Sequence, residues 1–119
     1  MANAPKAAAT GPDWGSVLKD MVSQASSAAS QNWGSAKVYA ETELKKLALQ
    51  GEAVLADIQQ GKYSYDEGQL LLDWQKSYAQ RVIATAQGMN AIQAQAIVNA
   101  AMAVLTSALN AVIGAIKFT

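Results

Sequence analysis

The first run of apolar positions predicts a short helix at about residues 14–29. Its apolar side chains recur at helical spacing and share one face: Val17, Leu18, Met21, Val22 and Ala25. Asp13 stands immediately before this run and has the side-chain oxygen of a typical N-cap residue. Ser, Asn and Gly crowd the segment that follows. Because they compete with helical hydrogen bonding, a bend is expected near Asn32–Gly34.

The second pattern predicts a longer helix at about residues 36–60 with a heptad-like apolar seam. The seam follows a 4-3-4-3-4 spacing: Ala40, Leu44, Leu47, Gly51, Val54 and Ile58. Charged side chains occupy the opposite face, which is therefore expected to be solvated. Gly51 either lets another helix approach closely or weakens this helix by about 1 kcal/mol relative to Ala.

A short turn separates this helix from the next. Gly61 is placed to end the second helix. Ser64 and Glu67 form an S-x-x-E capping box ahead of an apolar run, which predicts a new helix start. A turn of so few residues makes the two flanking helices antiparallel neighbours.

A third helical segment is expected over residues 65–116, where the sequence contains no Pro. If unbroken, it would be about 75–80 Å long at about 1.5 Å per residue. Gly88-Met89-Asn90 is the only interruption that the sequence offers. A bend there would fold the tail back against the first two helices in a compact bundle, and the sequence leaves both arrangements open. The first half is amphipathic, and its large apolar face comprises Leu71, Trp74, Tyr78 and Val82. Between Arg81 and Lys117 there is no charged residue.

This uncharged segment, residues 82–116, carries a second apolar seam and a narrow polar stripe. The seam repeats the 4-3-4-3-4 spacing: Val98, Met102, Leu105, Leu109, Val112 and Ile116. The polar stripe consists of Gln95, Asn99, Thr106 and Asn110. A helix that is apolar over most of its circumference is usually buried, either in a protein assembly or in a membrane.

Length alone would let this segment cross a bilayer. Residues 96–116 supply 21 positions, and about 20 apolar residues suffice. Four of the 21 are polar, many others are Ala, and neither an aromatic belt nor a basic cluster flanks them. Burial by protein is therefore favoured, with burial in a membrane as the alternative.

Composition supports a helical fold and narrows the chemistry. The 119 residues include 25 Ala and 11 Gln but only two Pro and one Phe, which favours helix. Nine Lys plus Arg balance nine Asp plus Glu, so the chain lacks the basic excess of a nucleic-acid-binding protein. It has no Cys and no His, which excludes thiolate and imidazole catalysis, disulfides and the common zinc sites.

Together these patterns predict an all-α fold, a helical hairpin or small bundle with a short N-terminal helix and a long, charge-free C-terminal helix. Residues 13–119 are expected to form one domain. Residues 1–12 are expected to be a flexible leader, and they lack the apolar core of a secretory signal peptide. A cytoplasmic, signal-less exported or membrane-associated location is therefore open. In outline the architecture is similar to the helical-hairpin subunits of bacterial secretion needles and pili, a likeness that rests on no motif and transfers no residue role.

Candidate catalytic groups do not converge. Asp66 and Glu67 are adjacent carboxylates, but neighbouring helical positions do not face each other, and the helix macrodipole explains acids in a first turn. We expect no enzymatic activity, cofactor, metal or small-molecule substrate. Four aromatic residues gather around the turn: Tyr63, Tyr65, Trp74 and Tyr78. They are expected to close the hairpin end of the core, with a recognition patch as the alternative.

The sequence thus favours a non-enzymatic structural or interaction protein that self-assembles, as an oligomer or filament, through residues 82–116. Its expected partner is another copy or a helical partner protein, and not nucleic acid. The alternative is a membrane-active protein, such as a pore-former, translocator or phage-type lysis component, that inserts the same segment into a lipid bilayer.

Overall fold

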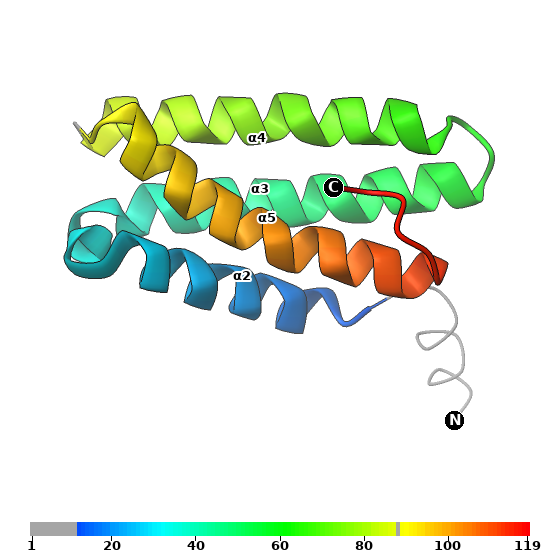
Figure 1. The fold of residues 1–119 in the computed structure, drawn as a ribbon, viewed down its shortest axis with the longest axis horizontal. Coiled ribbons are helices and arrows are strands. Elements are labelled where there is room, and N and C mark those ends of the chain that lie inside the picture. Colours follow the sequence, from blue (N-terminus) through cyan, green and yellow to red (C-terminus); the bar gives the residue numbers. More distant parts are fainter. Residues whose placement is uncertain (1–11, 88) are drawn as a thin grey trace.

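The computed structural model describes residues 12–87 and 89–119, and the regular structure within them is helical. The elements are α2 (Trp14–Ala29), a 3-10 turn η1 (Ser30–Asn32), α3 (Trp33–Gln59), α4 (Tyr65–Gln87) and α5 (Ala91–Ile113). They form an all-α small bundle (Figure 1), which confirms the predicted fold class. The leader expected at residues 1–12 lies outside the described residues except for Pro12.

The helix starts are set locally. The side chain of Asp13 accepts from the backbone N–H groups of Gly15 and Ser16 at 3.1 and 3.4 Å, and so caps α2. Between α2 and α3 the chain turns at η1, slightly earlier than the bend expected near Asn32–Gly34, and Ser30 there has a positive φ of 54°. This turn lets α3 begin at Trp33, three residues before the expected start.

The helical segment expected over residues 65–116 is two helices and not one, and it is divided at the interruption that the sequence offered. α4 ends at Gln87 and α5 begins at Ala91. Asn90 adopts an extended backbone, and its side chain accepts the N–H of Gln93 at 2.8 Å, so it caps a new helix. Gly88 of the anticipated interruption lies outside the described residues. The physical reason for the break is burial, because a straight helix would leave the apolar seam of α5 in solvent.

The break folds α5 back over the rest of the chain. It runs obliquely from the end of α4 and lies along α2 (Figure 1), and it also contacts α3 and α4. α3 and α4 form an antiparallel hairpin alongside. Large side chains from all four α-helices are fully buried where these elements meet: Met21, Leu44, Leu47, Leu72, Ile83, Ile97, Leu105 and Leu109. The predicted α3 seam supplies much of this core, since Ala40, Leu44, Leu47, Gly51 and Val54 are buried and Ile58 is half-buried.

Two glycines permit the closest helix contacts. A Cβ on Gly51 would lie 2.8 Å from Leu105 Cδ1, so this seam position lets α5 approach α3. A Cβ on Gly68 would lie 2.8 Å from both Val54 Cγ1 and Ile58 Cδ1, so Gly68 sets the spacing of α4 against α3. A side chain at either glycine would push the two helices apart and so weaken the dense packing between them.

Residues 114–119 form a tail that doubles back from the end of α5 (Figure 1) and contacts the start of α4 through Tyr65 and Gln69. Gly114, with φ of 81°, ends α5 in the left-handed conformation. The Asn110 side chain then accepts the N–H groups of Lys117 and Phe118 at 3.0 and 2.9 Å and donates to the Phe118 carbonyl at 3.0 Å. Phe118 is buried and packs edge-on against Tyr65, with ring centroids 6.0 Å apart.

Neighbouring residues at the end of the tail are held by different helices. The Gln69 side chain of α4 accepts the N–H of Thr119 at 3.0 Å and donates to its carbonyl at 3.2 Å. Asn110 of α5 binds the residues just before it. The tail therefore ties the end of α5 to the start of α4.

Gly68→Ala should lower the free energy of unfolding by about 1–3 kcal/mol, because Val54 is β-branched and cannot move aside easily. Gly34→Ala is the control, since nothing lies within 4 Å of a Cβ there, and it should raise stability by up to about 1 kcal/mol. Urea unfolding followed by circular dichroism measures both. Equal effects of the two substitutions would contradict the close contact at Gly68.

Phe118→Ala should lower the free energy of unfolding by about 3 kcal/mol or more, and Asn110→Ala by about 1–3 kcal/mol, because backbone groups of the tail lose their partner. Asn99→Ala is the matched control, an exposed amide on the same helix, and should change stability by less than about 0.5 kcal/mol. If Asn110→Ala behaves like Asn99→Ala in urea unfolding, the tail contributes no stability.

Candidate interaction surface

The α5 seam lies mostly inside the bundle. Val98, Met102, Leu105 and Leu109 are buried, Val112 is half-buried, and Ile116 lies beyond the end of the helix and is 85% exposed. The expectation that another molecule must cover this seam assumed a single long third helix. Because the chain folds back, its own helices cover most of the seam: α5 packs mainly against α2 and also contacts α3 and α4.

The predicted polar stripe does not act as one set. Gln95 and Asn99 are exposed to solvent. The Thr106 hydroxyl donates to the Met102 carbonyl at 2.9 Å within its own helix. Asn110 is occupied by the tail. The amides and hydroxyl therefore have three separate roles, and only the first two residues face outward unpaired among the described contacts.

The four aromatic residues around the turn divide into two pairs. Tyr63 and Tyr65 are half-buried and close the hairpin end, Tyr63 by donating to Asp57 Oδ2 at 3.1 Å. Burial, and then this hydrogen bond, raises the pKa of Tyr63. Trp74 and Tyr78, in contrast, are exposed on α4. The expectation that all four close the core holds for the first pair only.

α4 turns its larger apolar face outward. The sequence places Leu71, Trp74, Tyr78 and Val82 on one amphipathic face, yet none of these four is buried. The buried line is Gly68, Leu72, Ala79 and Ile83. Small residues in this line let α4 lie close to α3, which large aromatic rings would prevent. The 4-7-4 spacing of this second line, which keeps its residues on one helix face, was the signal that sequence reasoning missed.

Three large side chains therefore stand in a row on the outside of the bundle. Leu70, Trp74 and Tyr78 follow one another at intervals of four residues, and are 49%, 62% and 47% exposed. We call these three residues the α4 stripe. At its C-terminal end is a hollow of about 370 Å³ lined by Tyr78, Arg81, Val82 and Thr85. Trp and Tyr are the residues most enriched where protein interfaces gain their affinity.

A charged pair from α3 borders the α4 stripe. Lys46 Nζ lies 5.7 Å from the centre of the Tyr78 ring and 3.0 Å from Glu43 Oε2. The hydrogen bond and charge of Glu43 raise the pKa of Lys46. Glu43 is only 3% exposed, and its Oε1 atom has no hydrogen-bond partner. One of the two oxygen atoms of this buried carboxylate is thus without a hydrogen bond.

Other polar groups near the turn have structural partners. The N–H of Ser64 donates to Glu67 Oε1 at 2.8 Å, and the N–H of Glu67 donates to Ser64 Oγ at 3.2 Å, so the capping box is formed. In the described ranges 12–87 and 89–119, no three His, Cys, Asp or Glu residues come together in a group able to hold a metal ion. The α4 stripe is therefore the candidate functional site.

Comparisons with family models, curated proteins and solved structures found no match to this chain.

Glu43→Met should raise the free energy of unfolding by about 1 kcal/mol or more, because it removes a buried, half-satisfied carboxylate and leaves only the exposed Lys46 without a partner. Glu52→Met, on the exposed side of α3, is the control and should change stability by less than about 0.5 kcal/mol. A loss of stability in the first variant, measured by urea unfolding, would show that the carboxylate is needed in the core.

Proposed function

We propose that this protein is a non-enzymatic helical protein that self-associates, and that it does so through the α4 stripe. The observation that carries the proposal is the row of exposed Leu70, Trp74 and Tyr78 on one helix. Contiguous apolar surface of this kind marks protein interaction sites on soluble proteins. Low charge and zero net charge also favour association.

This proposal moves the assembly surface from the C-terminal helix to α4. The α5 seam is largely enclosed by the chain, so it has little apolar area left to offer a partner. Ile92 and Ile116 are the exposed large apolar residues that remain at the two ends of that segment. They are separated by the length of α5 and do not make a continuous patch.

The membrane-active alternative has one observation in its favour. α5 is long and apolar enough to cross a membrane, with a mean hydropathy of 1.9 in its most apolar window, of which 33% is buried. A core helix of a soluble protein passes the same test. Insertion would also require α5 to leave α2 and expose Met21 and Ala25, which are fully buried. Self-association is therefore the better supported function.

Trp74→Ala combined with Tyr78→Ala should weaken self-association about tenfold or more, because interface aromatics supply most of the affinity where they pack. Size-exclusion light scattering over a range of protein concentrations measures the effect. Leu70→Ala should act in the same direction. Leu49→Ala is its matched control, a 55% exposed Leu that borders Trp14 and Leu18 of α2, and should leave association unchanged.

Flotation with phospholipid vesicles, zwitterionic and anionic, tests the alternative in the same preparations. We expect an oligomer in detergent-free buffer that does not float with either vesicle. A protein that stays monomeric at all concentrations and floats with vesicles would overturn self-association in favour of membrane insertion. A monomer that ignores both vesicles would overturn both functions.

A further inference from the structure

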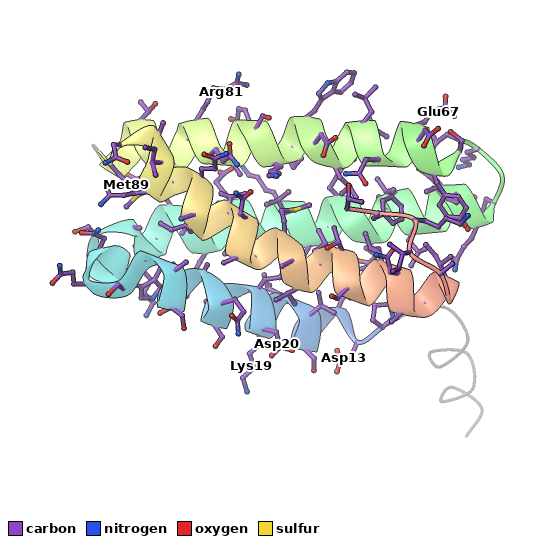
Figure 2. The ribbon with its side chains drawn as sticks, in the orientation of Figure 1. Asp13, Lys19, Asp20, Glu67, Arg81 and Met89 are labelled. Atoms are coloured by element: carbon purple, nitrogen blue, oxygen red, sulfur yellow. The ribbon has the colours of Figure 1, made fainter. Side chains whose placement is uncertain are left out.

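The charged residues of α4 are segregated along the helix, with the acidic ones in its first half and the basic ones following them. The acidic residues of the helix, Asp66, Glu67 and Asp73, all precede its basic residues, Lys76 and Arg81. Figure 2 shows Glu67 at the start of α4 and Arg81 in its second half. A helix with this polarity attracts another copy of itself when the two run antiparallel, and repels it when they run parallel.

A line of three exposed residues runs beside the α4 stripe. Asp73, Ser77 and Arg81 follow one another at intervals of four residues, and all three are exposed. Asp73 Oδ1 accepts from Gln69 Nε2 at 2.9 Å. Among the described residues, neither Asp73 nor Arg81 takes part in an ion pair. Asp73 and Arg81 are thus each four residues away from Ser77, the small residue between them.

We propose that the partner of the α4 stripe is α4 of a second copy, packed antiparallel about a two-fold axis at Ser77. This inference rests on the proposed function and names its partner and geometry. The axis places Asp73 of each copy opposite Arg81 of the other, which makes two equivalent ion pairs. The small Ser77 side chain on the axis lets the two helices approach to the 8–10 Å that is usual for packed helices.

The same register matches the apolar groups. Trp74 of each copy lies beside Tyr78 of the other, so this contact occurs twice, once on each side of the two-fold axis. Leu70 meets the far end of the partner helix, where the hollow lined by Tyr78, Arg81, Val82 and Thr85 is located. A two-fold interface requires such self-complementarity, in which each residue and its counterpart exchange places.

The two kinds of contact have different roles. Exposed ion pairs contribute little affinity, typically about 0.2–1 kcal/mol each. The buried Leu and aromatic side chains therefore supply the affinity, while Asp73 and Arg81 set the direction and register of the two helices. A parallel pair would oppose Asp73 to Asp73 and Arg81 to Arg81, and is disfavoured by like-charge repulsion.

A charge-exchange experiment tests this geometry. In a dimer of Asp73→Arg alone, both ion pairs become contacts between two positive charges, and in a dimer of Arg81→Asp alone both become contacts between two negative charges. Each variant should therefore self-associate about tenfold or more weakly than the unaltered chain. Mixing the two variants restores opposite charges at both ends of the interface. The mixture should form a heterodimer with an affinity close to that of the unaltered protein. Native mass spectrometry distinguishes it, because the variants differ in mass.

The control and the contrary outcomes are specific. Asp20→Arg makes the same charge change on α2, on the side of the bundle away from α4 (Figure 2), and should leave association unchanged. Circular dichroism checks that all variants are folded. If both α4 variants associate normally, or their mixture shows no preference for the heterodimer, the antiparallel register is overturned. Self-association through the α4 stripe is tested separately, by the Trp74 and Tyr78 substitutions.

Discussion

The packing of α5 against α2 is the interaction on which the rest of the structure depends. α5 has no charged residue, and its seam side chains, among them Leu105 and Leu109, are buried. A helix of this kind is stable in water only when other apolar surface covers it. The chain supplies that cover by reversing direction after α4.

The remaining contacts follow from this reversal. Gly51 gives α5 room beside α3. Asn110 and Gln69 hold the tail, so that Phe118 is buried between the end of α5 and the start of α4. Every described helix therefore has at least one covered face. On α4 that face is the one with the small residues, which leaves its large aromatic face to solvent.

This division of α4 is what connects the fold to a function. The face of α4 that packs against α3 carries the small residues Gly68 and Ala79, whereas Trp74 and Tyr78 are exposed. The absence of His and Cys from the chain limits the chemistry to carboxylates, amines and hydroxyls. Glu67 and Asp57, the carboxylates closest to the turn, are already bonded to Ser64 and Tyr63.

The sequence by itself determined the local features: the all-α class, the caps at Asp13 and Ser64, and the seam faces of α3 and α5. These depend on contacts within a few residues and on helical periodicity, both of which can be read from the chain. Only the tertiary structure decided that the helix breaks before Asn90, what covers the α5 seam, and which face of α4 points outward. Each of these depends on packing between segments that are distant in the sequence. A four-residue spacing places side chains on one face of a helix, but it does not tell whether that face is turned to the core or to solvent. Trp74 shows the limit most clearly, because its size suggests burial while the close approach of α3 and α4 excludes it.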